Sequence, residues 1–148
     1  MDDDLGIVDA LAQLSFVVQS TLARHAAAHD ASVVQARLLG ILRDREPTMQ
    51  ELARLLGLDK SSTSGLVDRA EQRHWVRRVP SAEDRRSTRV RLTATGRRLV
   101  NRVAEDFAAE IADLTAHLST GQRTALSALA SSVVLREQSV RPEVVPGR

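Results

Sequence analysis

Apolar residues at helical spacing predict one long helix near the start of the chain and a second one behind it. From about Leu5 to His29, apolar residues recur at intervals of three and four, the pattern of an amphipathic helix. They are Val8, Leu11, Leu14, Val18 and Leu22. Ser32–Gln35 then has the spacing of a capping box, in which each end side chain accepts a bond from the other's backbone N–H. We expect a second helix from there, ended by Pro47.

Two shorter helices come next, joined by a tight turn. Thr48–Glu51 is another capping box, and the helix it opens reaches Gly57, whose missing side chain permits a left-handed end. Asp59 can cap a following helix from about Lys60 to Arg73. Two short helices joined in this way predict a helix-turn-helix.

The pattern changes from helical to alternating after His74. Trp75–Val79 and Thr88–Leu92 are short β-prone runs. Pro80–Ser87, between them, is polar and suited to turns. We therefore predict a β-hairpin with a long basic tip.

Two more helices are expected in the last third of the chain. Thr93 can cap the first, and Ser119–Gln122 has the spacing to cap the second. Their apolar stripes are Leu99, Val103, Phe107, Ile111, Leu114 and Leu118, and then Leu126, Leu129, Val133 and Val134. The tail from Ser139, which contains Pro142 and Pro146, is expected to fray.

Length and composition predict one soluble domain. The chain has 148 residues, of which 43% are hydrophobic and 27% charged. It has no cysteine, which excludes a disulfide scaffold, a thiol sensor and a cysteine nucleophile. Asp2, Asp3 and Asp4 stand where a signal peptide needs positive charge, and we expect no apolar run near the length of a membrane span. A cytoplasmic protein without a membrane partner is the expectation.

The net charge of +2 hides a strongly basic centre. From Arg69 to Arg102, eleven arginines stand against three acidic residues, a net charge of +8, which leaves −6 for the rest of the chain. Such a segregated basic stretch is typical of nucleic-acid binding. A solvated face rich in arginine is the alternative that composition alone leaves open.

Four short motifs resemble the MarR family of bacterial transcriptional regulators. They are Gln50–Ala53, Leu66–Arg69, Asp84–Arg86 and Leu92–Gly96, of which the last two follow that family's wing and wing exit. The resemblance extends over nearly the whole chain. It implies a mainly α fold with a small β-hairpin wing, which is a winged helix-turn-helix with long N- and C-terminal dimerisation helices.

The same resemblance implies how the chain is divided and what it binds. Residues 1–30 and 94–138 would form the helical dimerisation region, 31–93 the DNA-binding region and 139–148 a flexible tail. The implied protein is a homodimer on double-stranded DNA, usually a repressor of a pseudo-palindromic operator and often released by a small-molecule ligand. Because no thiol is present, a ligand is the expected trigger.

If residues 60–73 form the helix in the major groove, helical spacing sorts them into two faces. The expected core-facing residues are Thr63, Leu66, Val67 and Ala70. The expected outward residues are Ser61, Ser62, Ser64, Gly65, Asp68 and Arg69. Serines near a helix N-terminus can meet phosphates or base edges, and Arg69 can reach phosphate or guanine. Ordinary helix capping is the alternative for the serines.

The hairpin tip is the second expected DNA contact. Arg85 and Arg86 would lie at the tip, and the resemblance implies that Arg86 enters the minor groove while the Asp84 carboxylate holds its guanidinium. Arginines along the strands would contact phosphates, namely Arg77, Arg78, Arg89 and Arg91. A solvated wing with a weak Asp–Arg pair is the alternative.

Two residues depart from the family pattern. Gly65 stands where the family often has a large or basic side chain, so either the backbone approaches DNA closely there or no base is read. His74 stands where glycine usually ends the helix; histidine can occupy a left-handed cap there, but with strain, so the conformation of this turn stays open.

Other chemistry finds little support in the sequence. His25 and His29 have the spacing of two metal ligands, but without a third we expect a polar helix end. No phosphate-binding loop or nucleophile motif is found, so we expect neither a cofactor nor an enzyme. Two alternative functions stay open: a non-specific architectural DNA-binding protein without a regulatory ligand, and a protein-interaction module whose wing meets an acidic partner.

Overall fold

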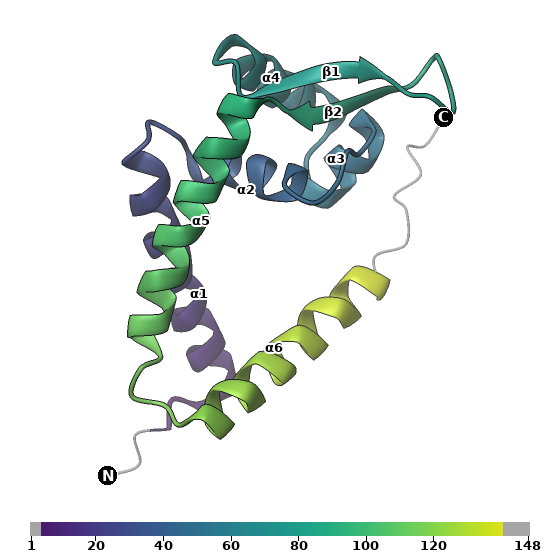
Figure 1. Cartoon of the computed structure of the whole chain (residues 1–148). Helices are drawn as coiled ribbons and strands as arrows, with labels where there is room; N and C mark the ends of the chain where they lie inside the picture. The colour runs from purple at the N-terminus through teal and green to yellow at the C-terminus, as the bar shows by residue number, and fades with distance from the viewer. Residues whose placement is uncertain (1–3, 141–148) are drawn as a thin grey trace. The chain divides into compact units, whose positions relative to one another are not determined.

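The computed structural model describes residues 4–140, and the chain divides into two compact units, Met1–Glu110 and Ile111–Arg148. The elements in chain order are α1 (Gly6–Ala27), α2 (Val33–Leu42), α3 (Met49–Leu56), α4 (Lys60–Gln72), β1 (Val76–Pro80), β2 (Thr88–Leu92), α5 (Ala94–Leu114) and α6 (Thr120–Val140). The predicted mainly α fold with one hairpin is confirmed (Figure 1).

The caps predicted for the middle helices are present. Ser32 and Thr48 each form a complete capping box, with Gln35 and Glu51 respectively. Gly57 ends α3 in the left-handed conformation, with φ of 66°. The helix-turn-helix is therefore confirmed as α3, the turn and α4.

The end of α2 differs from the prediction that Pro47 stops it. The helix ends at Leu42, and the segment that follows turns toward the hairpin instead. There the carbonyl of Pro47 accepts the backbone N–H of Val90, and Thr48 forms a β-bridge with Arg89. The residues around Pro47 thus pair with β2 and lie outside the helix.

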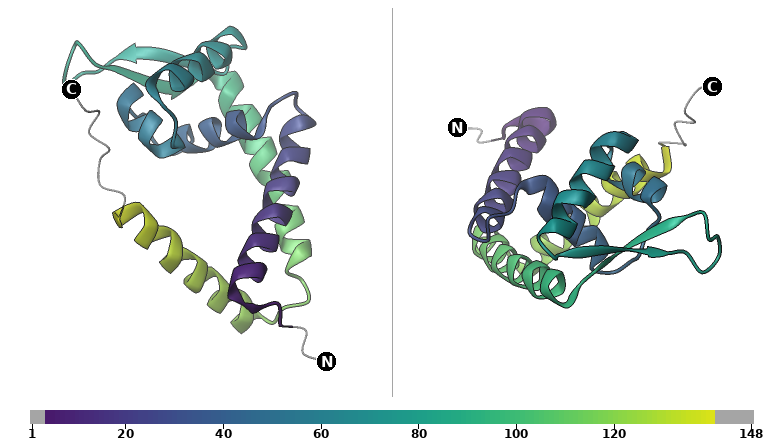
Figure 2. Two further views of the ribbon diagram at one scale, coloured as in Figure 1. Left: turned by 180° about the vertical axis from the view of Figure 1, so that it is seen from behind. Right: turned by 90° about the horizontal axis from the view of Figure 1, so that it is seen from above.

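The two strands form an antiparallel hairpin, with Val76 opposite Leu92 and Pro80 opposite Thr88. Figures 1 and 2 show the hairpin projecting beyond α3 and α4 as a wing, with the loop between β1 and β2 at its tip. One end of each strand belongs to the core, since Val76, Val90 and Leu92 are buried. The other end is thus free to extend from a fixed base.

The core of the first unit lies where α2, α3, α4 and the base of the hairpin meet. Its largest fully buried side chains are Leu38, Leu39, Leu42, Leu52, Leu66, Val67, Val90 and Thr63. On α4, the residues expected to face the core are the buried ones: Thr63, Leu66, Val67 and Ala70. This burial leaves the opposite face of α4 exposed.

Helix α1 pairs with α5 near its C-terminal end but exposes most of its apolar side chains. Arg24 and His25 both contact Glu110, with 2.6 Å between His25 Nε2 and Glu110 Oε2. His25 is thus paired with a carboxylate. Further toward the N-terminus, Ile7 and Val8 are 73% and 77% exposed.

Helix α1 also corrects one expectation from the sequence. By length and composition alone it is long and apolar enough to cross a membrane, whereas no such run was expected. Polar residues stand between its apolar ones, so that the helix is apolar on average without a long uninterrupted apolar run. A helix with exposed apolar side chains equally suits packing against a partner chain.

The second unit contains the end of α5 and all of α6. Ser119 and Gln122 form the predicted reciprocal cap at the start of α6. Every residue of Thr120–Val140 is exposed, including Leu129 and Val133. Of the tail that is expected to fray, residues 139 and 140 are helical and exposed, and the rest, 141–148, lies outside the described residues.

Candidate nucleic-acid interface

At the N-terminal end of α4, the helix cap already engages one of the serines that were expected to meet DNA. The Asp59 carboxylate accepts the Ser62 backbone N–H at 2.7 Å and the Ser62 hydroxyl at 3.0 Å. Ser62 therefore takes part in ordinary helix capping, which was the alternative to a DNA contact for the serines of α4. Ser61 and Lys60 are exposed at the same end of the helix.

Two cap carboxylates are held in their charged form by these contacts. The backbone N–H of Ser62 is the main cause that lowers the pKa of Asp59 below its ordinary value. The pKa of Glu51 is lowered chiefly by the backbone N–H of Thr48, with help from Arg89 and Arg54. Both helices therefore begin with an ionised carboxylate bound to backbone N–H groups.

Gly65 leaves a shallow depression in the middle of the exposed face of α4. Its lining residues are Lys60, Ser61, Ser64, Gly65 and Asp68. A Cβ at Gly65 would lie 3.3 Å from Nη1 of Arg69, so the guanidinium rests over the place where a side chain would start. The glycine therefore lets Arg69 lie close along the helix.

Arg78 on β1 is paired with acidic residues of α4, contrary to the expectation that it faces phosphate. Its Nη2 lies 2.8 Å from Asp68 Oδ1, and its Nη1 pairs with Glu71 Oε2. Its backbone N–H also donates to Glu71 Oε1 at 2.9 Å. The side chain is only 26% exposed, because it lies between the strand and the helix.

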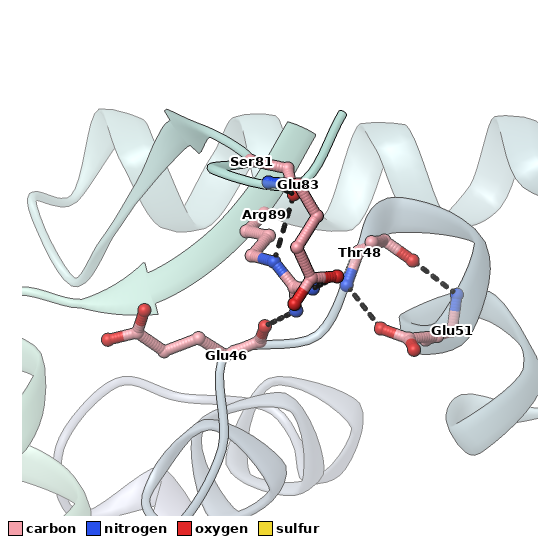
Figure 3. A network of polar contacts seen from close by, with 6 residues as sticks. All are labelled: Glu46, Thr48, Glu51, Ser81, Glu83 and Arg89. Carbon is pink, nitrogen blue, oxygen red and sulfur yellow. Dashed lines mark hydrogen bonds and ion pairs between the residues drawn. The ribbon is translucent and has the colours of Figure 1, made fainter. Parts of the chain in front are cut away.

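Arg89 on β2 also points into the protein (Figure 3). Its guanidinium donates to the Glu46 carbonyl at 2.8 Å and to the Ser81 hydroxyl at 3.3 Å. It also pairs with Glu83 at 3.3 Å, and on the same strand Arg91 pairs with the Glu46 carboxylate at 2.7 Å. These contacts favour a structural role for Arg89 over the predicted phosphate contact, because they direct its donors toward the protein.

At the wing tip, Asp84 binds the backbone of Arg86 and not its side chain. The Arg86 backbone N–H donates to Asp84 Oδ1 at 2.9 Å, the geometry of an Asx turn. The expected carboxylate–guanidinium pair is not found among residues 4–140. A carboxylate two residues away reaches the nearer backbone donor and shapes the turn. Arg85 and Arg86 are exposed beyond it.

The turn at the end of α4, which the sequence left open, is a left-handed histidine. His74 has φ of 58°, and the N–H groups of His74 and Trp75 bond back to the carbonyls of Glu71 and Ala70. This arrangement turns the chain sharply from α4 into β1. The wing therefore starts at a defined angle to the helix.

The seven arginines of α4 and the hairpin thus form two sets. Arg78, Arg89 and Arg91 hold the hairpin to α4 and to the segment before α3. The exposed set consists of Arg69, Arg77, Arg85 and Arg86. An exposed helix face beside an arginine-tipped wing can bind a polyanion with grooves, which is the shape and charge of duplex DNA.

The sequence prediction missed the partners that organise this site. Glu46, Glu71 and Ser81 had no assigned role, yet each binds a hairpin arginine. Glu71 lies on α4 and Arg78 on β1, beyond the turn at His74, so the periodicity of a single element does not connect them. The only signal in the sequence was the chemistry of these residues: two carboxylates and a hydroxyl that can each bind an arginine.

Comparison with known proteins gives relatives over most of the chain. It is 28% identical over 131 residues to the HTH-type transcriptional regulator PecS of Dickeya dadantii, which covers 86% of this chain and 79% of that protein. It is also 28% identical over 127 residues to the HTH-type transcriptional repressor NicR of Pseudomonas putida, with 80% of each covered. A mutant of MarR from E. coli, solved with operator DNA, superposes with a TM-score of 0.72 at 21% identity, covering 87% of this chain and 94% of that one.

The fold and the exposed basic face define the class of the protein: a winged helix-turn-helix protein. Residues 29–87, which contain α2, α3, α4, β1 and the wing tip, match the model of the MarR family. Over these residues the chain is similar to the MarR family, and the relatives extend that similarity over most of its length.

Proposed function

We propose that this protein is a transcriptional regulator that binds duplex DNA as a homodimer and acts as a repressor of a pseudo-palindromic operator. The observation that carries the proposal is the exposed face of α4 beside a wing tip that presents Arg85 and Arg86 to solvent. Two such units would set their α4 helices in successive major grooves, about 34–36 Å apart. Regulation, not catalysis, is the activity, as it is for the relatives of this family.

Each site residue has a proposed role that follows its exposure and contacts. On α4, Ser61, Gly65 and Arg69 would meet the major groove, while Ser62 and Ser64 would hold the cap and the helix–wing contact. On the wing, Arg86 and Arg85 would reach the minor groove, and Asp84 would shape the turn that aims Arg86. Arg89 would support the wing from behind.

Support for the repressor and ligand parts comes from the relatives. NicR is described as a repressor, and the structure of NadR, a protein of the same fold at 19% identity, was solved with 4-hydroxyphenylacetate. A ligand would act here by binding two dimer conformations unequally, since only differential affinity shifts their populations. Such a regulator would work in the cytoplasm, where the chromosome is.

The test is DNA binding by Arg86→Ala, measured by fluorescence anisotropy over a range of salt concentrations. We expect the affinity for a fragment from upstream of the protein's own gene to fall at least about tenfold, and the salt slope to become shallower by about one unit. Arg37→Ala, at an exposed arginine of α2, is the matched control for loss of one charge. Unchanged affinity in Arg86→Ala would remove the wing from the interface.

A non-specific architectural role is the second candidate, favoured by one feature of α4. Gly65 lacks a side chain, and the hydroxyls of Ser62 and Ser64 are engaged within the protein, which leaves few groups to read bases. The ratio of affinities for the upstream fragment and for random duplex separates the two functions. A ratio near one favours the architectural role, and about 10³ or more favours the regulator.

A further inference from the structure

Arg78 occupies an unusual place for an arginine beside a DNA-binding face. It lies on β1, between the wing and α4, and its side chain contacts three residues of α4. Besides Asp68 and Glu71, its Nη2 approaches the Ser64 hydroxyl at 3.4 Å. One guanidinium thus spans two turns of the helix that carries the proposed base contacts.

The charge of Asp68 makes this contact consequential. Asp68 lies on the outward face of α4, beside Arg69, and its side chain is 55% exposed. An unpaired carboxylate at that position would repel the phosphates that flank a groove. The guanidinium at 2.8 Å cancels this charge locally while leaving the side chain on the surface.

The second effect of Arg78 is mechanical. Its backbone N–H and its side chain both bind Glu71, so the start of the wing is tied to the last turns of α4 at two points. The left-handed turn at His74 connects α4 and β1 within only a few residues. The tie therefore fixes the wing direction relative to α4, which pre-organises two DNA contacts at once.

We propose that Arg78 is a positioning residue for DNA recognition, which acts by neutralising Asp68 and holding the wing on α4 and makes no contact with DNA itself. This inference rests on the proposed function, because it needs α4 and the wing to bind duplex DNA. It gives a positioning role to one arginine of the basic centre.

The test is a double-mutant cycle on the full chain, with Arg78→Gln, Asp68→Asn and the combined variant. We expect Arg78→Gln to weaken binding of the upstream fragment about tenfold, because Asp68 is left unpaired. Asp68→Asn alone should stay within about threefold of wild type, and the combined variant should recover the part of the loss that comes from the unpaired Asp68, at least about threefold, while the part due to the lost side-chain contact with Glu71 remains. The combined variant should also keep the wild-type salt slope, since no phosphate contact is lost.

The control is Arg77→Gln, at the exposed neighbour on the same strand. Its loss, whatever the size, should not be recovered by Asp68→Asn, because no ion pair joins Arg77 to Asp68 among residues 4–140. Melting temperatures are measured for every variant. A fall in stability that tracks the affinity and is not reversed by Asp68→Asn would reduce Arg78 to a purely structural residue and overturn the proposal.

Three outcomes would contradict either the positioning role of Arg78 or the proposed function. Equal weakness of Arg78→Gln and the combined variant, with a shallower salt slope, would mean that Arg78 touches DNA itself. Wild-type affinity in Arg78→Gln would mean that it has no role in binding. Failure of the wild-type protein to bind any duplex at low salt would instead overturn the proposed function. If Arg78→Gln does not fold, Arg78→Met takes its place in the same cycle, since methionine is uncharged and unbranched and fills irregular gaps in packing.

Discussion

Gly96 lies so close to the backbone of Trp75 that no side chain fits there. A Cβ at Gly96 would stand 1.9 Å from the Trp75 carbonyl oxygen and 2.8 Å from its carbon. The same carbonyl accepts the Thr93 backbone N–H at 3.0 Å, while the Thr93 hydroxyl caps α5 by accepting the Gly96 N–H at 3.0 Å. The Leu-Thr-x-x-Gly motif therefore joins the start of α5 to the base of the wing.

We expect Gly96→Ala to destabilise the protein by about 3 kcal/mol or more, because the backbone of Trp75 must move. Gly40→Ala is the matched control, since a Cβ there meets nothing within 4 Å and alanine is the better helix former. It should raise stability by up to about 1 kcal/mol. Urea unfolding followed by circular dichroism measures both, and equal effects of the two variants would contradict the close approach.

At the scale of elements, α3 and α4 depend on ionised caps. Glu51 and Asp59 both have lowered pKa values in the folded chain, so above their ordinary values of 4.5 and 3.8 the caps contribute fully to stability. As the pH falls through the folded pKa values, each carboxylate takes up a proton and that contribution is lost. The helix-turn-helix should therefore weaken in acid.

The matched variants Glu51→Gln and Asp59→Asn keep the caps but cannot ionise. Between about pH 5 and about pH 3, we expect the free energy of unfolding of the double variant to fall less steeply than that of the wild-type protein. Urea unfolding at each pH gives the two slopes. Identical slopes would mean that other carboxylates govern acid sensitivity.

The hairpin shows which features of an element can be predicted from sequence. Its strands were predicted to within one residue, because alternation of apolar and polar residues is local. The direction of its arginines was not. Arg89 and Arg91 bind Glu46, which lies 43 and 45 residues earlier in the chain, and no periodicity connects residues so far apart.

At the scale of the whole molecule, the exposed apolar side chains of α1 and α6 suggest that a partner chain covers them. Ile7 and Val8 on α1, and Leu129 and Val133 on α6, are between 62% and 77% exposed. Monomeric soluble proteins rarely expose so many large apolar residues on long helices. The proposed homodimer would cover such side chains and would make folding depend on protein concentration.

We expect sedimentation equilibrium to give a dimer at micromolar concentration, and Leu129→Glu to shift the protein toward monomer by at least about tenfold in dissociation constant. Leu129 and Val133 share one face of α6, and Ser131, exposed on the opposite face, provides the control Ser131→Glu. That control should stay dimeric. A monomeric wild-type protein would contradict the proposal that two α4 helices of a dimer bind successive major grooves.

The sequence by itself determined the order and type of the elements, the caps, the left-handed end at Gly57, and the buried face of α4. Each of these depends on residues within about one helical turn or one strand pair. Only the tertiary structure decided which arginines face solvent and which hold the wing. It did so because a guanidinium pairs with whatever carboxylate or carbonyl the fold brings within reach, and that choice is made across elements.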